Sequence, residues 1–186
     1  MNSTYLMTVM ALLGAADARV GSGSCPKVQM DTIDTNKLDG KWYEIQRERA
    51  FPWGFSSECV TQEYKREDNQ TLSYNYRAWY LALFFQYAEV NGKLNNCNTP
   101  TVNGELTETC KLTMPEFNAE GSMNIMHLED NWFSSYSCWE SIPGVSYVDF
   151  VFINSRNRTM TAEELKIAHD KIKATLPEYE PILTDF

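Results

Sequence analysis

The sequence has few of the residues and patterns on which enzymes and nucleic-acid-binding proteins depend. Its 186 residues include only two histidines, and 16 lysine and arginine residues against 25 acidic residues give a formal net charge of −9. This shortage of positive charge argues against binding to a phosphate backbone, which depends on a basic surface. No polybasic cluster marks a site for an anionic membrane surface either. We therefore expect no nucleic-acid partner.

The signatures of cofactor and metal chemistry are also missing. The sequence contains no serine–histidine–acid signature, no phosphate-binding P-loop and no dinucleotide fingerprint. Its five cysteines form no C-x-x-C pair and have no histidine-rich partner, so a zinc site is not expected. These absences predict a protein with no catalytic residue, no cofactor and no metal.

The N-terminal apolar stretch is too short to span a membrane. It runs from Tyr5 to Ala16, about 12 residues, whereas a spanning helix needs roughly 20. The triplet Ala16-Asp17-Ala18 that follows matches the small-residue pattern of a signal-peptide cleavage site. We predict a signal peptide over residues 1–18, a single domain over residues 19–186 and a secreted protein. The alternative is a frayed helix of a cytosolic protein.

Export would place the cysteines in an oxidising compartment. Five cysteines then predict two disulfides and one free thiol. The cysteines are Cys25, Cys59, Cys97, Cys110 and Cys138. Acceptor triplets for N-glycosylation begin at Asn69 and Asn157, so both asparagines are predicted glycosylation sites.

Short β-rich runs separated by turn signals make up most of the remaining chain. The expected strands are Lys41–Gln46, Cys59–Lys65, Thr71–Trp79, Lys111–Met114, Ser122–Leu128, Trp132–Trp139 and Val145–Asn154. The dipeptides Asn91-Gly92 and Asn103-Gly104 predict turns.

One helix is expected near the end of the chain, at about residues 162–175. Thr161 and Glu164 form a capping box, and Pro177 ends the helical run. The apolar stripe of this helix consists of Leu165, Ala168, Ile172 and Leu176. About eight antiparallel strands followed by one packed helix predict an all-β fold, a closed up-and-down β-barrel, because closure removes the sheet edges. The interior of an eight-stranded barrel can hold one small ligand.

Three sequence blocks resemble the lipocalins, especially those of the apolipoprotein D type. The first is Leu38-Asp39-Gly40-Lys41-Trp42-Tyr43-Glu44-Ile45, and the second is Tyr136-Ser137-Cys138 followed by Val148-Asp149-Phe150. The third is Ser155-Arg156-Asn157, just ahead of the expected helix. The blocks follow the family's order over almost the whole mature chain. The resemblance implies an eight-stranded barrel that carries or sequesters a small hydrophobic ligand.

The resemblance also implies structural roles for three residues of these blocks. Trp42 would close one end of the barrel, and the Arg156 guanidinium would lie across the Trp42 indole, a cation–π contact worth roughly 0.5–2 kcal/mol. Gly40 completes the signature.

The family's disulfide pattern maps onto part of the cysteine set. It implies a bridge between Cys25 and Cys138. The family's second bridge joins the position of Cys59 to a cysteine near the C-terminus, but no cysteine follows Cys138 here. We favour a bridge between Cys97 and Cys110 and a free thiol at Cys59, although sequence does not determine connectivity.

Two features depart from the family. Its T-D-Y segment is absent, and Trp79–Phe85 replaces a tight turn between two strands. In a lipocalin this connection lies at the open end of the barrel, beside the loop that here contains Phe51, Trp53 and Phe55. Either the strands are long and these side chains belong to the core, or they form an apolar rim. Such a rim would meet a lipid surface, a partner, a second copy of the chain or a ligand tail.

A carrier of a small hydrophobic molecule is the leading functional hypothesis. The lining residues predicted from strand parity are Tyr74, Tyr76, Phe84, Met126, Trp132 and Tyr136. A register slip of one residue would turn each of them outward. A sterol, fatty acid, retinoid, carotenoid or bilin would suit such an interior.

Two alternatives remain open at this point. The prostaglandin D synthase type of lipocalin uses a free cysteine near the position of Cys59, so the resemblance allows an enzyme with a Cys59 nucleophile. Only His127 and His169 could serve as its histidine partner. The other alternative is an interaction protein that docks through the aromatic rim.

Overall fold

The computed structural model describes residues 20–26, 28, 34–48, 57–68, 71–80, 86–95, 110–115, 119–177 and 183–185. Its elements are β1 (Val20–Ser22), η1 (Thr35–Leu38), β2 (Gly40–Glu48), β3 (Ser57–Arg66), β4 (Leu72–Tyr80), β5 (Gln86–Asn95), β6 (Cys110–Met114), β7 (Ala119–Leu128), β8 (Trp132–Ile142), β9 (Ser146–Ser155), α2 (Ala162–Thr175) and β10 (Leu183–Asp185). Within these ranges, no helix has the length and apolar character needed to cross a bilayer.

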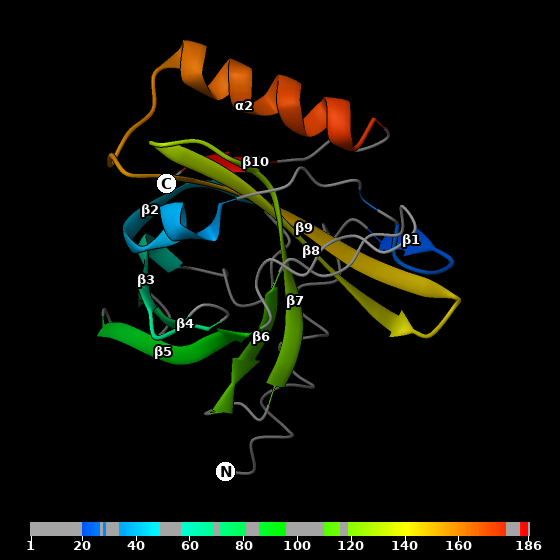
Figure 1. The fold of residues 1–186 in the computed structure, drawn as a ribbon. Coiled ribbons are helices and arrows are strands. Elements are labelled where there is room, and N and C mark those ends of the chain that lie inside the picture. The colour runs from blue at the N-terminus through cyan, green and yellow to red at the C-terminus, as the bar shows by residue number, and fades with distance from the viewer. Residues whose placement is uncertain are drawn as a thin grey trace.

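Strands β2 to β9 form a closed antiparallel barrel. Each pairs with the next strand in the chain (Figure 1), and β9 pairs back with β2. In this closing pair Glu44 lies opposite Asn154. The short strands β1 and β10 extend the sheet by pairing with β9 and β2, respectively. The predicted eight-stranded barrel with one C-terminal helix is therefore confirmed.

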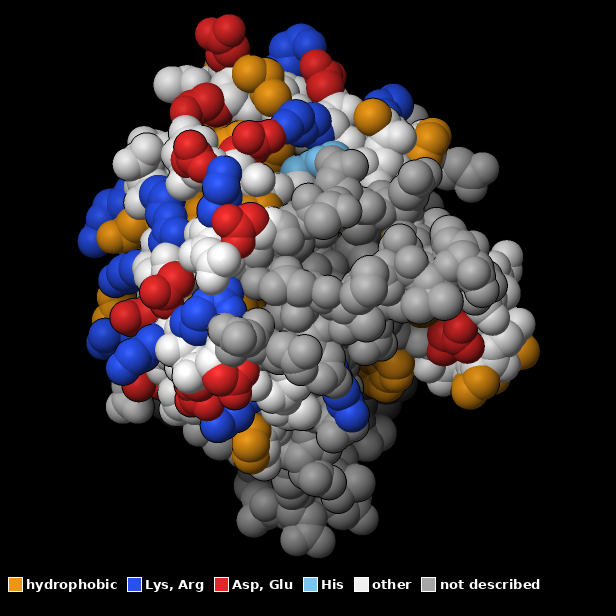
Figure 2. Space-filling view, viewed as in Figure 1, with side chains coloured by type: hydrophobic (Ala, Val, Ile, Leu, Met, Phe, Trp, Pro, Cys, Tyr) orange, Lys and Arg blue, Asp and Glu red, His pale blue; other side chains and the backbone are white. Residues whose placement is uncertain are grey.

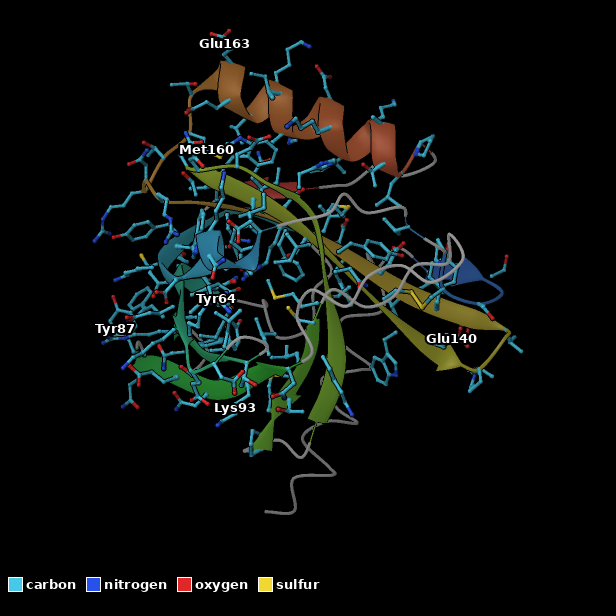
Figure 3. The ribbon with its side chains drawn as sticks, in the orientation of Figure 1. Tyr64, Tyr87, Lys93, Glu140, Met160 and Glu163 are labelled. Carbon is cyan, nitrogen blue, oxygen red and sulfur yellow. A yellow bond between two sulfur atoms is a disulfide. The ribbon has the colours of Figure 1, made fainter. Side chains whose placement is uncertain are left out.

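Helix α2 lies across the outside of the barrel, over strands β7 to β9 (Figure 1). Its capping box is formed as the sequence predicts: the Glu164 backbone N–H donates to Thr161 Oγ1, and the Thr161 backbone N–H donates to Glu164 Oε2. Ala168, Ile172 and Leu176 are buried against the barrel, and Met160 packs beside them (Figure 3). The apolar stripe thus positions the helix.

One end of the barrel is closed by Trp42, which is fully buried. Its ring nitrogen donates to the carbonyl of Leu38, and its ring meets Phe133 edge-on with centroids 4.9 Å apart. The Arg156 guanidinium lies 3.6 Å from the Trp42 ring centroid and donates to the carbonyls of Lys37, Lys41 and Asp39. These contacts lie where the resemblance places them.

Gly40 is required at this closed end. Its φ of +102° falls in the left-handed region, which disfavours other residues, and a Cβ there would lie 2.9 Å from Arg156 Nη1. The glycine therefore admits the arginine to its site beside Trp42.

The turn predicted at Asn91-Gly92 does not exist. Both residues lie inside β5, and Gly92 pairs with Tyr74 of β4. A Cβ at position 92 would lie 2.5 Å from the Thr113 carbonyl oxygen of β6. The glycine therefore marks a close approach of two backbones within the sheet.

We expect Gly92→Ala to lower the free energy of unfolding by about 1–3 kcal/mol, because the added methyl group overpacks the β5–β6 contact. Urea denaturation would measure this change. Asn91→Ala, at the exposed neighbouring position, should change the free energy of unfolding by about 0.5 kcal/mol. Equal effects of the two substitutions would contradict this role of Gly92.

The cysteines follow the predicted pattern as far as the structure describes them. Cys25 and Cys138 form a disulfide, which confirms that prediction. Cys59 is free and exposed, and Cys110 is disulfide-bonded. Cys97, the partner predicted for Cys110, lies outside the described residues, as do Asn69 and the signal peptide.

Candidate functional site

The interior of the barrel contains two connected sets of buried apolar side chains. The set near the closed end comprises Leu38, Trp42, Tyr64, Leu72, Leu94, Cys110, Met123, Ile125 and Phe133, with Tyr74, Leu112 and Leu128 packed against it. The second set consists of Val60, Tyr76 and Ala78, with Tyr74, Tyr80 and Val90 packed against it. Tyr74 contacts both sets and so joins them. Alternate residues of β3, β4 and β5 supply most of the second set.

A polar cluster, defined here as Glu44, Arg47, Gln62 and Tyr64, lies within this interior. Arg47 Nη1 donates to Glu44 Oε1 at 2.9 Å, and Gln62 Nε2 donates to Glu44 Oε2 at 3.2 Å. The Tyr64 hydroxyl donates to Gln62 Oε1 at 2.5 Å, and Arg47 Nη2 donates to the Ser57 carbonyl at 3.2 Å. Tyr64 is labelled in Figure 3. The cluster is a continuous hydrogen-bonded network from β2 to β3.

A charged pair is unusual in such a place. Glu44 and Arg47 are each only 3% exposed, whereas on the face shown in Figure 2 charged side chains of both signs are interspersed over the described residues. Removing two charges from water is expensive, so a buried pair contributes little stability by itself. A buried charged pair inside the barrel is therefore a candidate for a functional role.

Burial controls the protonation of this site. It raises the pKa of Glu44 to about 7, against the lowering effects of Arg47 and Gln62. Burial, followed by the charge of Glu44, also raises the pKa of Tyr64 well above its ordinary value. The pKa values of Tyr74 and Tyr76 are raised well above the ordinary value for the same main reason. The hydroxyl groups of these tyrosines are therefore neutral at neutral pH, where the Glu44 carboxyl group titrates.

The comparisons with known proteins agree with this architecture. Apolipoprotein D from Macaca fascicularis is 28% identical over 165 residues, which cover 85% of this chain and 80% of that protein. Bilin-binding protein from Pieris brassicae is 27% identical over 164 residues, which cover 86% and 81%. Insecticyanin from the tobacco hornworm Manduca sexta has a TM-score of 0.72 at 14% identity, covering 90% of this chain and 88% of that chain. The fold is that of a lipocalin.

The resemblance to the apolipoprotein D type, first indicated by three short blocks, is thus confirmed over most of this chain. No family model matches the chain.

Two of the predicted lining residues, Tyr74 and Tyr76, lie within the interior sets. Three others do not: Met126, Trp132 and Tyr136 pack in the cluster beneath α2, on the outer face of the barrel. On β8, Phe133 points inward. Because side chains alternate along a strand, Trp132, one residue before it, and Tyr136, three residues after it, point outward. On β7, a bulge between Ile125 and His127 shifts the register. Phe84 lies outside the described residues, as do Phe51, Trp53 and Phe55.

The parity prediction missed the polar side chains of the interior. Glu44 appears in the sequence only as part of a signature, and Arg47 and Gln62 were assigned no role. The sequence does contain a signal for the inward position of Gln62: on β3, Gln62 and Tyr64 alternate with the charged and exposed Glu63 and Lys65. This alternation places the glutamine on the buried face.

The features proposed for catalysis are not gathered at one place. Cys59 is exposed, at a β3 bulge where its φ is +51°. His127 Nε2 contacts the Lys171 carbonyl and the Thr175 hydroxyl of α2, and His169 Nε2 contacts Gln46 Oε1. Both imidazoles therefore bond where the helix meets the barrel. Among the described residues, no group of His, Cys, Asp or Glu could hold a metal ion.

Proposed function

We propose that this lipocalin is a secreted carrier that binds one small hydrophobic molecule inside its barrel. The observation on which the proposal rests is the composition of the interior: tyrosine and aliphatic side chains enclose one hydrogen-bonded polar cluster. Small-molecule sites have this combination of apolar lining and a few polar groups that fix orientation.

The comparisons support the same class of function. One relative, at 27% identity over most of both chains, is named as a bilin-binding protein. A bilin is therefore one candidate, together with a sterol, fatty acid, retinoid or carotenoid. The exposed thiol of Cys59 and the contacts of both histidines favour a carrier over an enzyme.

Export is part of the proposal. Residues 1–18 would be removed as a signal peptide, and the Cys25–Cys138 disulfide suits an oxidising compartment. Asn157, a proposed glycosylation site, is exposed after the end of β9. Docking of the open end on a lipid surface, or on a second copy, remains a hypothesis for residues outside the described part.

Native mass spectrometry of the protein purified from its own organism would test the carrier function. We expect an additional non-covalent mass that mild activation releases and that identifies the ligand class. Protein refolded without lipid should show the apo mass and regain the additional mass from an organic extract of the source. Failure of both preparations to bind any component of the extract would overturn the proposal.

A further inference from the structure

A buried asparagine lies beside the polar cluster, on the inward face of β9. Asn154 is opposite Glu44 on one side and opposite Phe133 on the other, and both of those side chains belong to the interior. The flanking Ile153 packs beneath α2 on the outer face. Because side chains alternate along a strand, Asn154 points into the barrel.

The amide group of Asn154 has no hydrogen-bond partner among the described residues. The side chain is fully buried, and neither its Nδ2 nor its Oδ1 atom is hydrogen-bonded to a residue that the structure describes. Most buried polar side chains in proteins are hydrogen-bonded, and leaving one unpaired is destabilising. A donor and an acceptor therefore lie side by side in the interior, next to a carboxyl group that is itself bonded to Arg47 and Gln62.

We propose that Asn154 recognises the ligand, and that the buried end of the ligand carries an uncharged amide, either a carboxamide or a lactam. This inference rests on the proposed carrier function and specifies its ligand class. The N–H and C=O groups on one edge of such an amide complement Oδ1 and Nδ2 of Asn154 in a two-bond pair. An ester offers only an acceptor, and a carboxylate would face the charge of Glu44 across the β2–β9 pair.

A matched pair of probes tests this assignment. Dodecanamide and methyl dodecanoate share one alkyl chain, but only the amide can donate a hydrogen bond. Their affinities would be measured by displacement of Nile red from the refolded, lipid-free protein. We expect wild type to bind dodecanamide about tenfold more tightly than the ester, which corresponds to the additional hydrogen bond.

Asn154→Leu should abolish this preference, because it removes two hydrogen bonds from the bound amide and one from the bound ester, so amide binding should weaken about tenfold more than ester binding. Asn75→Leu is the matched control, because Asn75 lies on β4 between the inward-pointing Tyr74 and Tyr76 and bonds to Asn91. It should keep the wild-type preference. Thermal unfolding would show whether each variant folds, and replacing an unpaired buried amide with leucine should leave the Tm unchanged or higher.

The side-chain amide resonances of Asn154 in wild type provide a second measurement that needs no variant. They should shift further when dodecanamide binds than when the ester binds, because only the carboxamide bonds to Oδ1 as well as to Nδ2. Equal affinity for the two probes, or a preference that survives in Asn154→Leu, would overturn the assignment while leaving the carrier function intact. Failure of the barrel to bind Nile red and both probes would overturn the carrier function and the assignment together.

Discussion

Replacing both Cys25 and Cys138 with serine should lower the free energy of unfolding by about 5 kcal/mol. The two cysteines are separated by 113 residues in the sequence, and the loss of conformational entropy that a cross-link imposes on the unfolded chain grows with the enclosed loop. Urea denaturation of the oxidised wild type and the double variant would measure the difference. Cys59→Ser, at the exposed free thiol, should change the free energy of unfolding by no more than about 0.5 kcal/mol.

The bridge also has a local role, which this variant would reveal. The Cys25 backbone N–H donates to Glu140 Oε1, and the Gly144 N–H donates to Glu140 Oε2, so the disulfide and this carboxylate hold the N-terminal segment against the β8–β9 hairpin (Figure 3). These hydrogen bonds lower the pKa of Glu140. We therefore expect the double variant to lose proteolytic protection first at residues 20–26. A loss of stability below about 1 kcal/mol would show that the unfolded chain is not restricted by the bridge.

The sequence was sufficient for the barrel because its signals are local and mutually consistent. The capping box at Thr161 starts α2 where expected, and the strand expected at Val145–Asn154 is observed as β9, Ser146–Ser155. The Asn91-Gly92 dipeptide misled the prediction because glycine serves turns and close backbone approaches equally well. Only the position of the Thr113 carbonyl, distant in sequence, distinguishes the two uses.

The interior of the barrel was harder to predict, for a different physical reason. A strand covered by a helix is apolar on both faces, so the alternation that separates inside from outside disappears. Trp132 and Phe133 are adjacent and both buried, one toward α2 and the other toward Trp42. Composition cannot decide which of them lines the interior. Asn154 could have resolved the parity of β9, since a buried polar side chain does not suit the face against the helix.

The carboxyl group of Glu44 should make the stability of the protein depend on pH between about 4.5 and 7. Its pKa rises from 4.5 to about 7 on folding, so the folded state binds the proton more tightly than the unfolded state. This contribution to stability is complete below pH 4.5 and disappears as the pH rises through 7. A shift of this size corresponds to about 3 kcal/mol.

Glu44→Gln isolates this contribution, because the glutamine amide imitates the protonated acid at every pH. The free energy of unfolding of the variant minus that of wild type should be about 2.5 kcal/mol larger at pH 8 than at pH 5, because wild type has lost the contribution of the protonated carboxyl group at pH 8. Taking this difference cancels the constant effect of the lost bond to Arg47 and the titration of all unaltered groups. Glu63→Gln, on the exposed face of β3, is the control, and its difference between the two pH values should be below about 0.5 kcal/mol.

An equal response of the two variants would mean that Glu44 titrates as a solvated carboxylate and that water reaches the polar cluster. A larger response of Glu44→Gln would establish that the interior holds a proton near neutral pH. The carboxyl group beside Asn154 would then be uncharged below pH 7 and charged above it. Binding of a carboxylate such as dodecanoate should then weaken as the pH rises from 6 to 8, because a second negative charge meets Glu44. Binding of dodecanamide, which carries no charge, should be far less sensitive to the same change.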